Sequence, residues 1–90
     1  MPSETVEIVN KRGLHARASA KFVGLVSEKF EHLDVRVAKD GVDAEGGSIL
    51  GLMMLGAAKG DTVTVSVEGD GADAALDELA GLVRNGFGEE

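Results

Sequence analysis

His15 and Arg17 lie two residues apart, after a glycine turn and at the start of an apolar pattern with helical spacing. This position predicts that His15 is the N-cap of a helix or its immediate neighbour, where the backbone N–H groups of Ala16 and Arg17 have no partner inside the helix. Together with the helix dipole, these N–H groups form a site for phosphate or another anion. The Arg17 guanidinium adds a delocalised charge whose shape suits phosphate oxygens.

The chemistry that this arrangement favours is nucleophilic attack by the His15 ring. A positive helix end disfavours the imidazolium form and the neutral imidazole is the nucleophile, so one geometry favours both the attack and the stabilisation of an anionic product. A simpler interpretation, in which His15 only caps the helix or lies on the surface, stays open on these residues alone. His32, the other histidine, lies near the end of the same helix and is interpreted as a surface residue.

The charges are unevenly distributed along the chain. Sixteen acidic and 9 basic residues give a net charge of −7 at pH 7, which argues against nucleic acid and anionic membranes as partners. Residues 8–27 nevertheless contain no acid and hold Lys11, Arg12, Arg17 and Lys21, while residues 46–60 contain no acid and one base. This segregation predicts an anion site beside an apolar docking patch, with chance placement of solvated charges as the alternative.

The composition excludes several kinds of site and places the chain in a size class. Ninety residues suffice for one small domain, expected to span residues 1–90. The absence of cysteine excludes disulfides, thiol chemistry and cysteine-ligated metals, and two histidines are too few for a histidine-rich metal centre. No window is apolar enough for membrane insertion and no secretory signal is visible, so a cytoplasmic protein is expected.

Apolar spacing predicts seven elements in the order β-α-β-β-α-β-α. The strands are expected at residues 5–9, 34–39, 42–44 and 62–67, and the helices at residues 16–30, 49–55 and 72–84. The side chains expected to face inward include Val35, Val37, Val63, Val65, Val67 and, beyond the last helix, Phe87. Asp70 is predicted to cap the last helix, and Asn85-Gly86 is predicted to end it.

The order of these elements predicts an α+β two-layer sandwich. The helix between the first two strands requires a right-handed crossover, so these two strands run parallel. Asp40-Gly41 joins the second and third strands as a hairpin. Placing the last strand between the first two then gives a wholly antiparallel four-stranded sheet with three helices on one face.

Ser48 precedes an apolar run and is predicted to cap the short helix at residues 49–55. This helix is apolar on every side, and a domain of this size cannot bury all of them. Leu52 and Leu55 are expected in the core. The expected exposed patch consists of Ile49, Leu50 and Met53, and methionine suits a surface that accepts several partners. Ordinary core packing with a frayed helix end is the alternative.

The segment Asn10-Lys-Arg-Gly-Leu-His15-Ala-Arg17 strongly resembles the active-site signature of the HPr family, the histidine-containing phosphocarriers of the phosphoenolpyruvate phosphotransferase system. The resemblance covers the whole chain. The segment from Gly46 to Met53 is similar to the regulatory serine region of the family, and Ala57-Ala-Lys-Gly-Asp61 also matches. The Ala-Ser-Ala after Arg17 and the ending Asn85-Gly-Phe87 look most like the nitrogen-related branch, NPr.

Ala18 departs from the family pattern, which usually has proline at this position. Proline suits the first turn of a helix, but alanine is the best helix former, so the helix should form without it. The substitution is expected to alter the rigidity near His15 and to leave the function in place.

The resemblance implies an HPr-like open-faced fold and a covalent relay. An Enzyme I-type phosphohistidine would donate its phosphoryl group to Nδ1 of His15, which would pass the group to an EIIA-type acceptor in a sugar or nitrogen-regulatory branch. Arg17 and the backbone N–H groups of Ala16 and Arg17 would stabilise the phosphoryl group. Phosphoryl transfer is mostly positioning and charge neutralisation, so no metal or cofactor is expected. The chain would be a phosphoryl-carrier intermediate and not a stand-alone enzyme.

The resemblance also implies contacts with other proteins. The residues Ile49, Leu50 and Met53 would form the docking surface shared by donor and acceptor, with Lys21 among the cations that face acidic partners. Ser48 matches the serine that HPr kinase/phosphorylase phosphorylates in some bacteria, and a phosphate is well tolerated at a helix N-terminus. A monomer is expected, because one small carrier meets its partners in turn.

Two other functions compete with the phosphocarrier. A regulatory binding module of the same fold would signal through the phosphorylation state of Ser48 or His15, but the presence of both His15 and Arg17 argues against a purely regulatory version. A small ligand- or RNA-binding domain is the third candidate. With 3% aromatic residues and neither Trp nor Tyr, the chain lacks a platform for base stacking.

Overall fold

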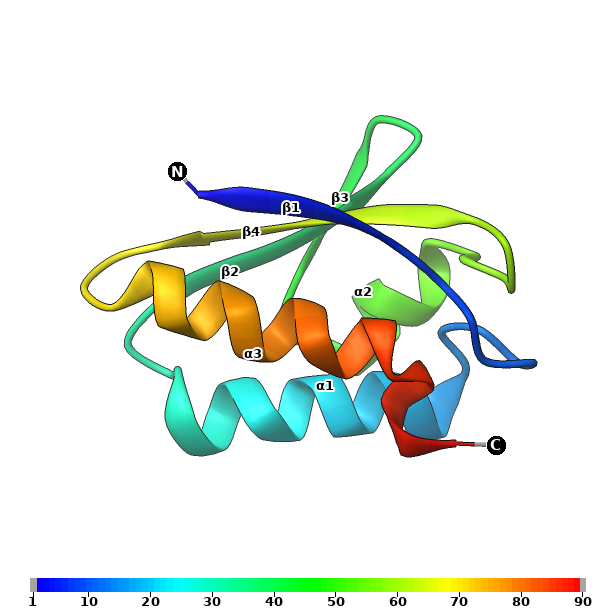
Figure 1. Cartoon of the computed structure of the whole chain (residues 1–90), viewed down its shortest axis with the longest axis horizontal. Helices are drawn as coiled ribbons and strands as arrows, with labels where there is room; N and C mark the ends of the chain where they lie inside the picture. Colours follow the sequence, from blue (N-terminus) through cyan, green and yellow to red (C-terminus); the bar gives the residue numbers. More distant parts are fainter. Residues whose placement is uncertain (1, 90) are drawn as a thin grey trace.

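The computed structural model, which describes residues 2–89, places three helices against one face of a four-stranded sheet (Figure 1). The strands are β1 (Ser3–Glu7), β2 (Asp34–Lys39), β3 (Val42–Glu45) and β4 (Thr62–Glu68). The helices are α1 (Ala16–Lys29), α2 (Ile49–Met54) and α3 (Ala72–Arg84), and a 3-10 turn at Gly86–Gly88 follows α3. The predicted order β-α-β-β-α-β-α and the α+β class are confirmed.

The sheet has the strand order β1-β4-β2-β3, and each neighbouring pair is antiparallel. The last strand therefore lies between the first two, as the crossover argument predicts. Alternation along β4 turns Val63, Val65 and Val67 toward the helices, where all three are buried. On the opposite face the hydroxyls of Thr5 and Thr64 lie 3.0 Å apart, so one face is core and the other is polar.

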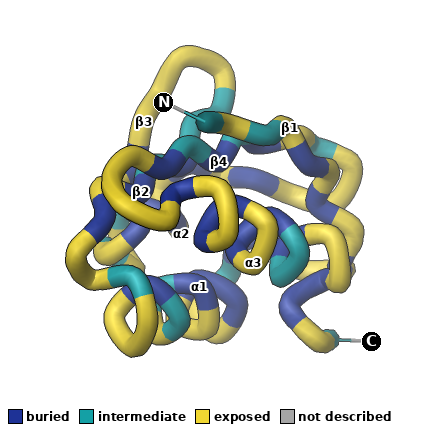
Figure 2. The backbone as a smooth tube through the Cα atoms, turned by 60° about the vertical axis from the view of Figure 1, so that its left-hand side comes forward, coloured by how far each residue is buried: buried dark blue, intermediate teal, exposed yellow. Residues whose placement is uncertain are grey.

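The two long helices lie side by side beneath the sheet and turn their buried faces inward (Figure 2). The side chains that α1 buries are Ala18, Ser19, Phe22 and Val26, and α3 buries Ala72, Ala75, Leu76, Leu79, Ala80 and Val83. Their spacing of three and four residues places them on one helix face. No helix within residues 2–89 is long and apolar enough to cross a bilayer.

The first strand begins and ends two residues earlier than predicted. At Ile8 the pairing passes from β4 to the loop before it, because Ile8 N–H donates to Asp61 O and Gly60 N–H donates to Ile8 O, each at 2.8 Å. Ile8 is fully buried at this junction. The alternating pattern that predicted a strand up to residue 9 thus extends past the end of β1 into a contact between two loops.

The prediction that Asp70 caps α3 is wrong. The N-cap is Gly71, which has a left-handed φ of 80° and no side-chain hydrogen bond to the helix. The chain turns through two positive-φ glycines, Gly69 and Gly71, and this turn leaves Asp70 one residue before the capping position.

Candidate functional site

His15 is the N-cap of α1, as predicted. Its backbone is extended, with φ −77° and ψ −177°, and its ring Nδ1 accepts a hydrogen bond from Arg17 N–H at 3.3 Å. The His15 carbonyl accepts from Ser19 N–H at 2.9 Å. In this state the His15 ring caps the Arg17 N–H, and the expected phosphate site at the N–H groups of Ala16 and Arg17 stays a prediction.

The loop before His15 is fastened to the loop before β4. Leu14 N–H donates to Ala57 O at 3.0 Å, and the Asn10 side chain donates through Nδ2 to Gly13 O at 2.9 Å. Gly13 has a φ of +62°, and a Cβ on this residue would lie 2.2 Å from Ala57 O. The close approach requires glycine here, and it fixes the backbone that presents His15.

A carboxylate from the far end of the chain contacts the His15 ring. Oε2 of Glu89 lies 2.8 Å from His15 Nε2 and Oε1 lies 3.1 Å from it, across 74 residues of sequence. The same Oε1 accepts from Asn10 Nδ2 at 3.0 Å. The side chains of His15 and Glu89 are only 19% and 14% exposed. The sequence interpretation missed Glu89, because residues 8–27 contain no acid of their own.

The segment after α3 carries Glu89 to the start of α1. Phe87 is 1% exposed, in the inward position predicted for it, and has a φ of +58°. Its carbonyl accepts from Lys21 Nζ at 2.7 Å. Figure 1 shows the 3-10 turn after α3 beside the first turn of α1. Phe87 was the one signal in the sequence for the position of Glu89. A residue two positions beyond a buried phenylalanine stays near the place where the phenylalanine packs.

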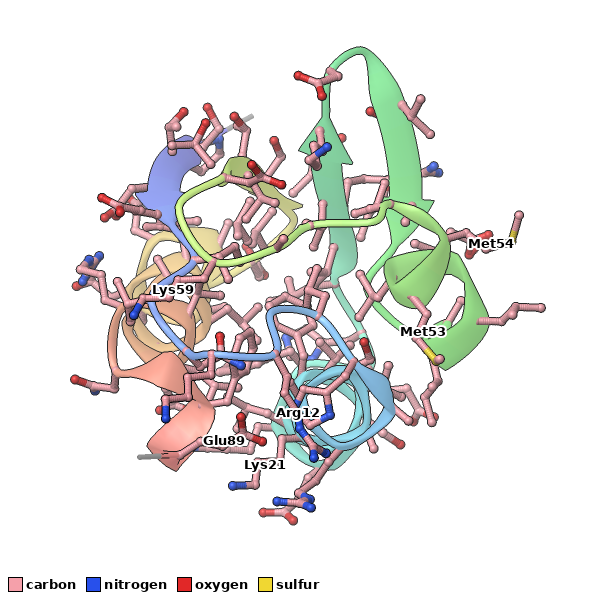
Figure 3. The ribbon with its side chains drawn as sticks, turned by 90° about the vertical axis from the view of Figure 1, so that its right-hand side faces the viewer. Arg12, Lys21, Met53, Met54, Lys59 and Glu89 are labelled. Carbon is pink, nitrogen blue, oxygen red and sulfur yellow. The ribbon has the colours of Figure 1, made fainter. Side chains whose placement is uncertain are left out.

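Four cations gather around this segment. Lys11, Arg12, Arg17 and Lys21 line a surface cavity of about 470 Å³ together with Gly88 and Glu89. Figure 3 shows Arg12, Lys21 and Glu89 at the same end of the molecule. The Arg17 side chain is 67% exposed, and its Nη1 lies 3.9 Å from Glu89 Oε2. The predicted cationic region around His15 therefore exists, and it is a concave surface.

These contacts affect the protonation of Glu89. The hydrogen bonds from His15 and Asn10 hold the pKa of the Glu89 carboxyl below its usual range, and the charge of Arg17 acts in the same direction. Glu89 is therefore ionised at neutral pH. Within residues 2–89, no group of three or more histidine and acidic side chains is placed to hold a metal ion.

Ser48 is the N-cap of α2, as predicted. Its Oγ accepts from Gly51 N–H at 2.9 Å. Leu52 and Leu55 are buried, and the three residues expected in the exposed patch, Ile49, Leu50 and Met53, are all exposed. Met54 is also exposed and was not predicted. Figure 3 shows the side chains of Met53 and Met54 pointing in different directions from α2. His32 is exposed, as predicted.

Comparison with known proteins assigns the chain to a family. The family model described as "PTS HPr component phosphorylation site" matches residues 2–85. The chain belongs to the HPr family. Phosphocarrier protein HPr of Cupriavidus necator is 43% identical over 82 residues, covering 91% of this chain and 90% of the relative. Phosphocarrier protein NPr of Shewanella violacea is 43% identical over 84 residues, covering 93% of this chain and 90% of the relative, in agreement with the NPr-like features of the sequence.

Solved structures of HPr proteins share the fold. The HPr crystal structure from Thermoanaerobacter tengcongensis superposes with a TM-score of 0.90 at 41% identity, covering 100% of this chain and 99% of the other. The HPr structure from Bacillus anthracis has a TM-score of 0.83 at 35% identity, covering 91% and 95% of the two chains. The chain thus has an HPr-like fold and a phosphocarrier role in the phosphotransferase system, and its partners are other proteins of that system.

Proposed function

We propose that His15 is the residue on which this phosphocarrier holds the phosphoryl group, received from an Enzyme I-type phosphohistidine and passed to an EIIA-type protein. The observation that carries the proposal is the state of the His15 ring. Nδ1 accepts from the Arg17 N–H at 3.3 Å, and a nitrogen that accepts a hydrogen bond has a lone pair and no proton. Nδ1 is therefore the nucleophile.

The transfer exchanges one N–P bond for another. The Nδ1 lone pair of His15 bonds to phosphorus while the bond to the donor's ring nitrogen breaks, and the donor nitrogen keeps that electron pair. Once Nδ1 is bonded to phosphorus it no longer accepts from Arg17 N–H. The N–H is then released beside the new phosphoryl oxygens, at the positive end of a 14-residue helix. Transfer to the acceptor histidine is the same exchange in reverse.

The positive side chains around the cavity neutralise the phosphoryl charge. The Arg17 guanidinium has no contact shorter than 3.9 Å among the salt bridges of residues 2–89, so it turns to the phosphoryl group without breaking a strong pair. Its planar fork suits two phosphoryl oxygens at once. Lys11 and Arg12 line the same cavity and add positive charge to it.

Docking uses the exposed side of α2 beside the cationic surface. The residues that contact both donor and acceptor are Ile49, Leu50 and Met53, with Lys21 contributing charge toward acidic partners. Leu50 is 68% exposed beside the exposed Ile49 and Met53, and an apolar patch of neighbouring side chains favours a covered position in a complex. The protein acts as a monomer, because one small carrier meets its partners one at a time. Its place of action is the cytoplasm.

Ser48 supports a second, regulatory function of the same surface. Its Oγ is a helix cap at the edge of the exposed patch, so a phosphate on it would remain at a helix N-terminus and place negative charge beside Ile49 and Leu50. An HPr kinase/phosphorylase would thereby weaken docking without unfolding α2. A module that acts only through such contacts is the alternative to the relay.

The test is phosphorylation by phosphoenolpyruvate and an Enzyme I-type protein, followed by intact-mass measurement. We expect one added phosphate that is acid-labile and alkali-stable, absent in His15→Ala and present in His32→Ala. The two variants are matched, because each removes one histidine, and the exposed His32 lies beyond the opposite end of α1 from His15. A phosphate that persists in His15→Ala would contradict the proposal.

Arg17→Ala tests the charge argument separately. The side chain is mostly exposed, so the variant should unfold at the same urea concentration as the wild type and accept the phosphoryl group more slowly, by about tenfold or more. Loss of folding in Arg17→Ala would show that the residue has a structural role instead.

A further inference from the structure

The two ring nitrogens of His15 contact groups with opposite hydrogen-bonding roles, because one group can only donate and the other can only accept. The Arg17 backbone N–H is only a donor, so Nδ1, at 3.3 Å from it, must be the acceptor. An ionised carboxylate is only an acceptor, so Nε2, at 2.8 Å from Glu89 Oε2, must carry the proton. These two neighbours together select one neutral tautomer of the ring.

We propose that Glu89 is a positioning residue for phosphoryl transfer, which holds the His15 ring in the Nε2–H form with Nδ1 directed to the phosphoryl group. The inference rests on the proposed function of His15 and adds to it a residue that the sequence motif around His15 does not contain. In serine proteases, a buried carboxylate behind the catalytic imidazole orients the ring and fixes its tautomer in the same way.

Glu89 is held in place by contacts on both sides of it. Asn10 Nδ2 donates to Glu89 Oε1 at 3.0 Å and to Gly13 O at 2.9 Å, so one amide joins the carboxylate to the loop before His15. Both neighbours of Nδ2 are acceptors, which fixes the orientation of the amide. Asn10 is only 3% exposed, so this contact is not a chance meeting of surface side chains.

The backbone beside Glu89 is fixed in the same way. Glu89 N–H donates to Gly86 O at 3.0 Å, and Lys21 Nζ binds the Phe87 carbonyl at 2.7 Å. The buried Phe87 ring anchors the segment to the core. The carboxylate therefore reaches His15 from a fastened turn and not from a free tail.

The charge that develops during transfer favours a carboxylate at this position. When Nδ1 bonds to phosphorus and Nε2 keeps its proton, the ring becomes positively charged. The Glu89 carboxylate lies next to Nε2, on the side of the ring opposite to the phosphoryl group. The negative carboxylate stabilises the positive ring, while the cations and the helix N-terminus stabilise the negative phosphoryl group.

An occluding role for Glu89 fits the geometry less well. Its oxygens contact Nε2 and leave Nδ1 to the Arg17 N–H. Its distance from the Arg17 guanidinium, 3.9 Å, is too long for a strong ion pair that would keep Arg17 from phosphate. The carboxylate thus supports the reactive face of the ring without covering it.

The first test observes the ring without any phosphoryl transfer. Nitrogen-15 NMR of the full-length protein at neutral pH should show a protonated Nε2 and an unprotonated Nδ1, with a hydrogen-bonded Nε2–H protected from exchange with water. In Glu89→Ala this proton should exchange at least about tenfold faster. Glu78→Gln is the matched control, because it removes a carboxylate that pairs with Lys29 at 2.9 Å, away from His15.

The second test separates positioning from docking by measuring the transfer from a phosphorylated Enzyme I-type protein. Glu89→Ala should lower kcat by about tenfold and leave KM unchanged, because ring orientation acts after binding. Glu89→Gln retains an acceptor oxygen without the charge and should lie between Glu89→Ala and the wild type. Glu78→Gln should equal the wild type in both constants. The Glu89 variants are repeated with Glu90→Gln, so that the adjacent carboxylate does not replace the missing one.

The outcomes distinguish this proposal from the one on which it rests. A lower kcat together with faster Nε2–H exchange in Glu89→Ala supports the positioning role. An unchanged or higher kcat would overturn it, and a higher kcat would indicate occlusion. If the wild-type protein accepts no phosphate on His15, the proposed function fails, while the NMR result still decides whether Glu89 orients the ring.

Discussion

α1 and α2 both begin at a capping side chain, and the surroundings of the two caps differ. His15 caps α1 through Nδ1 at 3.3 Å, with Glu89 on its other nitrogen and four cations nearby. Ser48 caps α2 through Oγ at 2.9 Å, and the next charged residue along the chain is Lys59. A helix N-terminus alone thus specifies neither chemistry nor regulation. The side chains that distant segments bring to it decide which of these it supports.

The backbones before the two caps differ as much as their side chains, and glycine replacement should expose this difference. Gly13→Ala would place a Cβ 2.2 Å from Ala57 O at a residue with positive φ, whereas Gly47→Ala would meet nothing within 4 Å. We expect Gly13→Ala to lower the free energy of unfolding by about 2–4 kcal/mol. Gly47→Ala should be neutral or stabilising by up to about 1 kcal/mol. Urea unfolding measures both, and equal stability of the two variants would refute the contrast.

The Ser48 cap should matter more for stability than for chemistry. Ser48→Ala removes the bond to Gly51 N–H and should cost about 1 kcal/mol, whereas Ser48→Asp keeps an acceptor at the cap and should cost little. Neither change touches His15, so phosphorylation of His15 by the donor should remain complete in Ser48→Ala. Thermal unfolding and intact mass measure the two effects. A loss of His15 phosphorylation in Ser48→Ala would show that the two caps are coupled.

Local patterns predicted most of the fold. The period-two valines of β4 and the helical spacing in α1 and α3 are signals within a few residues of sequence, and the structure confirms all three elements. Both caps were predicted too, because His15 lies between a glycine turn and an apolar pattern with helical spacing, and Ser48 directly precedes an apolar run. Asp70 shows the limit of this reasoning: a good capping residue loses its position when two neighbouring glycines adopt positive φ.

The carboxylate in the site lay beyond such patterns. Glu89 meets His15 only because Phe87 packs in the core and the chain turns back after α3. No residue spacing encodes a contact across 74 positions. Residues 8–27 thus contain no acid of their own, and the fold brings the Glu89 carboxylate next to His15 within them. The role of Asn10 was missed for the same reason, because its partner Glu89 lies 79 residues away.

The two exposed methionines of α2 test whether its apolar surface has a specific docking face. Met53 is 40% exposed and Met54 is 76% exposed, and they point in different directions (Figure 3). Met53→Ser should raise the KM for the Enzyme I-type donor about fivefold, and Met54→Ser should leave it unchanged. Both should alter the free energy of unfolding by less than about 1 kcal/mol. Equal effects of the two changes on KM would indicate a general loss of apolar surface and not a defined face.

The smallest expected effect concerns pH, and it separates the charged start of α1 from the neutral start of α2. The pKa of Glu89 is lower in the folded protein than its ordinary value of 4.5, mainly through the hydrogen bond with His15 and then that with Asn10. A group with a depressed folded pKa adds stability above its unfolded pKa, and this stability is lost as the pH falls through the folded value. The difference in urea midpoint between the wild type and Glu89→Gln should therefore be present at pH 7, shrink below pH 4.5 and vanish once Glu89 is protonated. The difference between the wild type and Ser48→Ala should stay constant over the same range, since the Ser48 hydroxyl does not titrate. A midpoint difference for Glu89→Gln that persisted in acid would mean that its amide, and not the lost charge, causes the change.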